Sequence, residues 1–186
     1  STGEGGMLVT NNKAYFEKVK LLRSHGMTTL SYERSKGHST GYDVVNLGYN
    51  YRMDDIRASI GIVQLDKLKK DIEKRSGHRK NYVKYLKNNN KIIIPFEKRC
   101  GYLSNYIFAI VLNKSDRDNV RKELANKGIQ TSFHYPPVHK FSHYANYASS
   151  LPITDHVTDR LITLPLFASL KLSQINYICN TLEELI

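Results

Sequence analysis

The segment Gly48–Asp55, GYNYRMDD, places an amide and a guanidinium next to the start of an expected helix. A helix N-terminus attracts anions through its free N–H groups and its dipole. The planar guanidinium of Arg52 suits a carboxylate or a phosphate, and the amide of Asn50 can donate to a phosphate oxygen. The segment therefore predicts an anion site. The alternative is that Asn50 shapes a turn while Arg52 pairs with a nearby aspartate.

A second segment with chemical potential is SFHYPPVH, residues 132–139. Its two prolines exclude a helix, so the two histidines cannot form a zinc pair of the helical type, and no carboxylate follows at ligand spacing. We therefore expect no metal site. A strand end that projects His134 and Tyr135 into a cleft fits this segment, because histidine can hydrogen-bond or transfer protons near neutral pH. The alternative is a histidine exposed on a turn.

The glycine-rich run TGEGG near Ser1 matches neither common phosphate-binding pattern, since it lacks the GK[ST] ending and the GxGxxG spacing. Its paired glycines indicate a tight backbone path with positive φ. The sequence contains no Gly-x-Ser-x-Gly elbow, and no cysteine has a local catalytic signature. The residue types alone thus indicate anion binding without a nucleophile or base, as in a binding module or in part of an enzyme.

The composition is that of an ordinary soluble domain: 186 residues, 40% hydrophobic and 24% charged. This length fits one domain, or a small domain plus part of another. No apolar run reaches the length of a membrane span and no signal peptide is visible. We expect a cytoplasmic protein with no membrane partner, in which Cys100 and Cys179 are reduced core thiols.

The net charge of +11 is concentrated between Asp66 and Arg99, where twelve Lys or Arg stand against four Asp or Glu. Such a region attracts nucleic acid, anionic lipid or a phosphorylated metabolite. It is also what the solvated face of a lysine-rich helix looks like, and it lacks the stacking aromatics of nucleic-acid binders. We expect no nucleic-acid partner. The alternative of a basic nucleic-acid-binding module predicts binding that weakens steeply with salt.

Apolar spacing and turn residues predict the elements that position these groups. Asn11 or Asn12 should cap a helix that ends near Gly26, and Asp54 or Asp55 should start a long helix with a break at Ser76-Gly77. Strands are expected at 6–10, 92–94, 106–112 and 129–133, and helices at 115–128, 154–164 and 173–185, with Ser115 opening a capping box. This order predicts a small α/β layer from about residue 91 onward.

Five segments, taken in order, resemble the DegT/DnrJ/EryC1/StrS family of pyridoxal-phosphate (PLP) sugar aminotransferases: TGEGGMLVT, LLRSHG, LGYNYRMDDIRASIGIVQLDKL, SFHYPPVH and DRLITLPLF. The resemblance covers essentially the whole chain. It implies an α/β fold of PLP-transferase type I, like aspartate aminotransferase. Residues 1–75 would form the C-terminal part of the large PLP-binding domain, and residues 76–186 would form the small C-terminal domain.

The resemblance also implies roles for individual residues. The Schiff-base lysine would lie just before the TGEGG run, with Thr2, Gly3 and Glu4 beside it; Thr2 and Gly3 would border the cofactor and Glu4 the substrate. Asn50 would reach the PLP phosphate of the partner subunit in a homodimer with shared active sites. Arg52 would hold an anionic group such as the glutamate carboxylate. His134, a possible catalytic residue, and Tyr135 would lie near the sugar.

The implied reaction transfers an amino group from glutamate to a nucleotide-linked keto sugar, in the biosynthesis of a surface polysaccharide or amino sugar. Two alternatives stay open at this point. A sugar dehydratase of the same family would carry a histidine in place of the upstream lysine. A truncated remnant would keep the residues without the activity.

Overall fold

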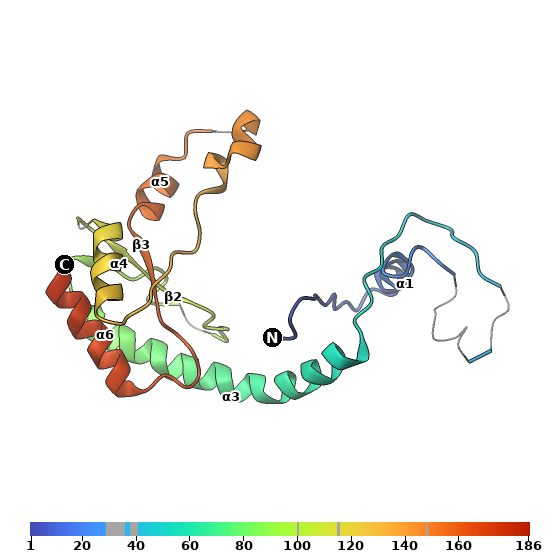
Figure 1. Cartoon of the computed structure of the whole chain (residues 1–186), viewed down its shortest axis with the longest axis horizontal. Helices are drawn as coiled ribbons and strands as arrows, with labels where there is room; N and C mark the ends of the chain where they lie inside the picture. Colours follow the sequence, from blue (N-terminus) through green and yellow to red (C-terminus); the bar gives the residue numbers. More distant parts are fainter. Residues whose placement is uncertain (29–35, 38–40, 100, 115, 148) are drawn as a thin grey trace. The chain divides into compact units, whose positions relative to one another are not determined.

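We describe a computed structural model, which covers residues 1–28, 36–37, 41–99, 101–114, 116–147 and 149–186. The chain divides into two compact units, residues 1–67 and residues 68–186, which can be followed by colour in Figure 1. The expected domain boundary at residues 75 and 76 stays a prediction. Cys100, Ser115 and residues 29–35 and 38–40 lie outside the described residues.

The first unit contains helix α1 (Lys13–Leu22). The expected cap is confirmed, because the Asn12 side chain accepts hydrogen bonds from the backbone N–H groups of Ala14 and Tyr15. The expected buried strand at residues 6–10 is wrong. Met7, Leu8 and Val9 are each at least 60% exposed, and the described part of the chain offers them no pairing strand. An extended segment becomes a strand only when a neighbour supplies hydrogen bonds.

Helix α3 (Asp55–Leu86) is continuous and belongs to both units. Its expected start is confirmed, since the Asp54 carboxylate accepts from the N–H of Arg57 at 2.8 Å. The expected break at Ser76-Gly77 is wrong. A glycine inside a helix costs only about 1 kcal/mol, and burial of Ile72 and Leu86 on either side stabilises the helix by more than that.

The second unit is built on a three-stranded antiparallel sheet in the order β1-β2-β3. The strands are β1 (Ile92–Ile93), β2 (Phe108–Leu112) and β3 (Leu161–Leu164). In the register, Ile92 pairs with Leu112 and Ile110 pairs with Ile162. The strands expected at 92–94 and 106–112 are thus confirmed, both of them shorter than predicted.

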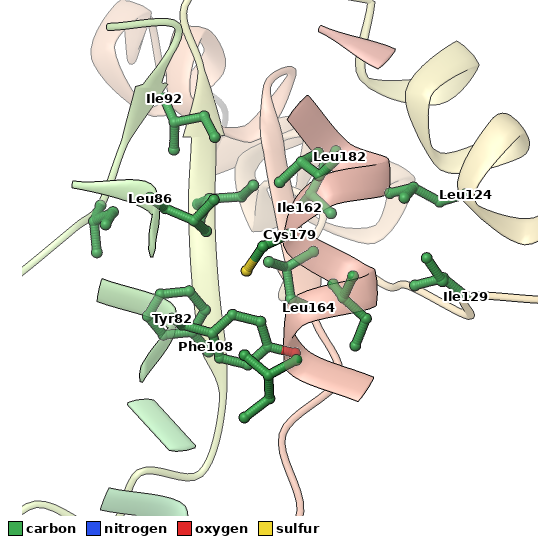
Figure 2. Packing of buried hydrophobic residues seen from close by; sticks show 14 of the residues in the cluster. Tyr82, Leu86, Ile92, Phe108, Leu124, Ile129, Ile162, Leu164, Cys179 and Leu182 are labelled. Carbon is green, nitrogen blue, oxygen red and sulfur yellow. The ribbon is translucent and has the colours of Figure 1, made fainter. Parts of the chain in front are cut away.

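The core of this unit lies between the sheet and the helices α3, α4 (Arg117–Asn126) and α6 (Leu172–Leu185). Figure 2 shows Tyr82 of α3 stacked on Phe108 of β2, with ring centroids 4.8 Å apart. Helical spacing predicts an apolar face of α6 made by Ile175, Ile178, Leu182 and Leu185. The first three are buried in the core, Leu185 is partly buried against it, and Cys179 is buried beside them. Cys179 is a buried free thiol, as expected.

Three expected elements of this unit differ from the structure. The helix expected at 154–164 is helix α5 (Pro152–Thr158) followed by strand β3, because β3 pairs with β2 along its whole length. The strand expected at 129–133 is reduced to one bridge, between Ser132 and Thr163, since the chain enters the extended Pro136-Pro137 pair shortly afterwards. Helix α4 is capped by Asp116, whose carboxylate accepts from two backbone N–H groups. Two short 3-10 helices, η1 (Val138–Lys140) and η2 (Ser142–Tyr147), complete the unit.

Candidate functional site

The GYNYR segment is fastened to the C-terminal end of α1 by backbone hydrogen bonds. Tyr49 donates to Leu22 O at 2.7 Å, His25 donates to Tyr49 O at 2.9 Å, and Tyr51 donates to Arg23 O at 2.8 Å. These bonds place the segment without help from its own side chains. The side chains between and beyond them are therefore available to form a site.

Two glycines make this close approach feasible. Gly26 has φ +70°, and a Cβ there would lie 1.9 Å from the carbonyl oxygen of Asn46. A Cβ on Gly48 would lie 2.1 Å from the backbone nitrogen of Gly26. Only glycine fits where two backbones approach so closely. The requirement for glycine in this block thus has a steric cause.

Arg52 forms the centre of a polar array beside this turn. Its Nε donates to Asn50 Oδ1 at 2.8 Å, and its Nη2 lies 3.3 Å from His25 Nε2. Because Asn50 Oδ1 is an acceptor, the amide nitrogen of Asn50 is the end that can donate to a ligand. The nearby Asp54 forms its ion pair with Arg57, at 3.5 Å. The array combines donors and positive charge, as the predicted anion site requires.

A cavity of about 1150 Å³ opens beside this array within the first unit. Its lining brings together the TGEGG run, α1 and the GYNYR segment. Among the lining residues in the described part of the chain, the only acid is Glu4, against four cationic side chains: Lys20, Arg23, Arg52 and Arg57. This excess of positive charge favours a phosphate or carboxylate ligand.

The predicted site residues near Ser1 are only partly found in this cavity. Glu4 lines it together with Gly5 and Gly6. Thr2 lies instead against α3, where its methyl group would be 3.5 Å from a Cβ on Gly61, and Gly3 adopts φ +79°. Cofactor binding by Thr2 and Gly3 stays a prediction. Sequence reasoning assigned no role to Lys20 and Arg23, which lie in and just after the last turn of α1, although Arg23 stands in the LLRSHG segment.

The second unit holds the other predicted group of residues around His134. Its imidazole Nδ1 lies 3.0 Å from Thr163 Oγ1 and 3.4 Å from Ser132 Oγ. The ring packs edge-on against Tyr135, with centroids 4.7 Å apart, and against Tyr106 at 6.3 Å. Tyr135 is exposed, and its hydrogen bond with Tyr106 raises the pKa of its phenol. Thr163 and Tyr106 were missed, because only the tertiary fold brings them to His134.

A separate cavity of about 720 Å³ lies beside His134 and Thr163. None of the residues that line it in the described part of the chain is Asp, Glu, Lys or Arg. The lining instead combines aromatic rings, including Tyr106, Phe167 and Tyr177, with polar groups that include Ser132 and Gln174. Such a surface suits a neutral ligand that offers both apolar faces and hydroxyl groups.

The second histidine of the SFHYPPVH segment has a different environment. His139 Nε2 lies 3.1 Å from Asp155 Oδ1, and the Lys140 ammonium lies 2.8 Å from the same oxygen. The hydrogen bond from Lys140 lowers the pKa of Asp155. These contacts join η1 to α5, which is a structural role. His134 and His139 therefore belong to separate groups, and their roles differ.

Comparison with known proteins identifies the class of protein that carries these features. Residues 1–183 match the DegT/DnrJ/EryC1/StrS aminotransferase family. The chain belongs to this family, and its fold is that of the type I PLP-dependent transferases, as the resemblance implied. Enzymes of the family depend on PLP.

Individual relatives agree with this assignment. The chain is 33% identical to the GDP-perosamine synthase of Escherichia coli O157:H7 over 186 residues, which are 99% of this chain and 48% of that protein. The structure of the aminotransferase TlmJ from Streptoalloteichus hindustanus is 26% identical with a TM-score of 0.82, covering 98% of this chain and 48% of that one. Streptococcus pneumoniae Spr1654 in its PMP form shares the fold, with a TM-score of 0.83 at 24% identity, over 97% of this chain and 47% of that one.

The chain thus spans about half the length of the relatives that it matches. This coverage agrees with the expectation that it corresponds to the C-terminal portion of the family fold. In the described ranges, no helix combines the length and the apolar character needed to cross a membrane.

Proposed function

We propose that the chain forms part of a PLP-dependent aminotransferase that moves an amino group from glutamate to a nucleotide-linked keto sugar. The observation that carries this proposal is the Asn50–Arg52–His25 array beside a cationic cavity, in a chain that matches the aminotransferase family over residues 1–183. The proposed pathway is the synthesis of a surface polysaccharide or an amino sugar, in the cytoplasm.

The donor set in the first cavity fits the cofactor. The phosphate of PLP is a dianion near neutral pH, and this cavity offers the amide of Asn50 with an excess of cationic side chains. When bound, PLP supplies the electron sink that amino transfer requires. In the proposed homodimer, Asn50 would donate to the phosphate of the cofactor held by the neighbouring subunit.

Arg52 is proposed to bind the carboxylate of the amino donor. Its guanidinium is held in place from one side by Asn50 Oδ1 and from another by His25. Because the Nε and Nη2 atoms of Arg52 are already held by these two contacts, little side-chain entropy is lost when a carboxylate binds. Glu4, an acid in the lining of the same cavity, would accept from an amino or hydroxyl group of a substrate.

The uncharged cavity of the second unit is proposed to take the sugar. Aromatic rings can pack against the apolar face of a pyranose, while Ser132 and His134 offer hydrogen bonds to its oxygens. Its lack of charged lining residues disfavours the diphosphate of the nucleotide.

The test is made on the full natural reading frame that contains this chain. The purified protein is incubated with PLP, ¹⁵N-glutamate and a nucleoside-diphosphate-linked keto sugar, and the mass of the sugar product is measured by mass spectrometry. Incorporation of ¹⁵N supports the aminotransferase. Loss of water from the sugar without added nitrogen identifies the dehydratase instead. If the protein is folded but does not convert the sugar, it is an inactive remnant.

Variants link the activity to the array. Replacing one charge-assisted hydrogen bond costs about 1.5–3 kcal/mol, which is roughly 10- to 150-fold in affinity. We expect R52A to raise KM for glutamate by that factor, and R52K to restore only part of it, because lysine lacks the planar fork. K87A, on an exposed part of the second unit, is the matched control and should behave like the wild type.

A further inference from the structure

Thr163 occupies a position in β3 that the proposed function does not use. Its backbone forms both hydrogen bonds of the bridge with Ser132: Ser132 N to Thr163 O at 3.2 Å, and Thr163 N to Ser132 O at 2.7 Å. Side chains alternate along a strand, so Thr163 points away from the core that contains Ile162 and Leu164. It nevertheless is only 6% exposed. A buried hydroxyl outside the core requires a hydrogen-bond partner.

That partner is His134. Thr163 Oγ1 lies 3.0 Å from His134 Nδ1, and this is the hydrogen bond of the Thr163 side chain in the described structure. Ser132 Oγ is further from the same nitrogen, at 3.4 Å, and Ser132 is exposed to solvent. A threonine side chain has restricted rotation at χ1 because it is branched at Cβ. Thr163 is therefore the better-defined partner of the imidazole.

The direction of this hydrogen bond follows from burial. If Nδ1–H donated to Thr163, the threonine proton would have no acceptor among the described residues, and a hydroxyl on a residue only 6% exposed is penalised when its proton is unpaired. If the hydroxyl donates to Nδ1, its proton is satisfied. The second arrangement is favoured, and in the neutral imidazole it leaves the proton on Nε2.

We propose that Thr163 is a positioning residue that fixes His134 in the Nε2–H tautomer, so that Nε2 serves as a hydrogen-bond donor to an oxygen of the ligand. Among the described residues, none accepts a hydrogen bond from Nε2, and His134 lines the uncharged cavity. The identity of the ligand oxygen, a keto or hydroxyl oxygen of the sugar, rests on the proposed function; the tautomer does not.

The tautomer is read directly by NMR. The 186-residue chain is labelled with ¹⁵N-histidine, and long-range ¹H–¹⁵N correlations are recorded at about pH 8, above the usual histidine pKa of about 6.5. The His134 signals are assigned by their loss in H134Q. We expect the wild type and T163S to show the pure Nε2–H pattern. In T163V, which keeps the shape but lacks the hydroxyl, the two nitrogen frequencies should shift toward those of an exchanging mixture of tautomers.

The controls separate this role from a structural one. S132A should leave the ring spectrum unchanged, because the Ser132 hydroxyl is farther from Nδ1 than that of Thr163, at 3.4 Å against 3.0 Å, and is exposed. Unchanged circular dichroism would show that T163V is folded, and T163A serves if T163V is not. An Nδ1–H pattern in the wild type, or identical ring spectra for the wild type and T163V, would overturn the proposal. The measurement needs no cofactor or substrate, so a failure of the aminotransferase assay leaves its result intact.

Discussion

The hydrogen bond from the Tyr82 hydroxyl to the Pro165 carbonyl joins the core of the second unit to the wall of its cavity. The two oxygens lie 2.9 Å apart, the Tyr82 side chain is fully buried, and Pro165 lines the cavity. In Tyr82→Phe the ring can keep its stacking on Phe108, so the change removes the hydrogen bond alone. We expect the free energy of unfolding to fall by about 1–2 kcal/mol, the net value of one hydrogen bond plus part of the cost of an unpaired carbonyl.

The measurement is urea unfolding of the 186-residue chain, followed by circular dichroism. The matched control is Tyr85→Phe, on the same helix but 40% exposed, which should stay within about 0.5 kcal/mol of the wild type. The slope of free energy against urea should be the same for all three proteins, since the surface exposed on unfolding hardly changes. Equal stabilities of Tyr82→Phe and Tyr85→Phe would refute the assigned role of this hydroxyl.

The same hydroxyl gives a pH-dependent signature. Burial raises the pKa of the Tyr82 phenol, with the Cys179 thiol adding to the shift. The native state therefore retains the proton when the unfolded chain loses it. The contribution of this group is fully present below the unfolded pKa of about 10 and declines as the pH rises above it. The stability difference between the wild type and Tyr82→Phe should shrink accordingly above about pH 10.

Three further predictions concern other parts of the fold. Gly48→Ala should destabilise the first unit by roughly 1–3 kcal/mol or more in a denaturant melt, because its Cβ would meet the Gly26 backbone at 2.1 Å. Gly77→Ala, with open space around its Cβ in α3, should instead stabilise the folded chain by about 0.5–1 kcal/mol. A change in unfolding free energy of the same sign for both variants would contradict the steric argument. Burial raises the pKa of the Cys179 thiol to about 12, so unfolding free energy should fall by up to about 1.4 kcal/mol per pH unit between about pH 9 and 12. The unfolding free energy of Cys179→Ala should lack this pH-dependent contribution. If the pH profiles of the wild type and Cys179→Ala were parallel, the thiol would make no such contribution. Asp116→Ala should cost about 0.5–2 kcal/mol through loss of the α4 cap, seen as a lower melting temperature.

Local chemistry alone was sufficient to predict several elements. An asparagine before an apolar helix pattern identified the start of α1, and an aspartate pair identified the start of α3. The apolar face of α6 followed from helical spacing. These predictions succeeded because caps and periodicity depend on residues within one or two turns. The motif order likewise identified the family, which the match over residues 1–183 bears out.

Other features depended on partners distant in the sequence. The Leu161–Leu164 segment has residues that suit either a helix or a strand, and its pairing with β2 decided for a strand. Met7–Val9 has the residue types of a strand but no pairing strand among the described residues, so it remains extended and exposed.

The candidate site shows the same division. The sequence by itself identified Asn50, Arg52 and His134 as groups able to bind or donate, because residue type determines which atoms donate and which carry charge. Only the tertiary structure decided what surrounds them. Arg52 meets His25 across a separation of 27 residues, and His134 meets Thr163 across 29. Hydrogen-bond direction and burial arise from such distant contacts, which no local pattern records.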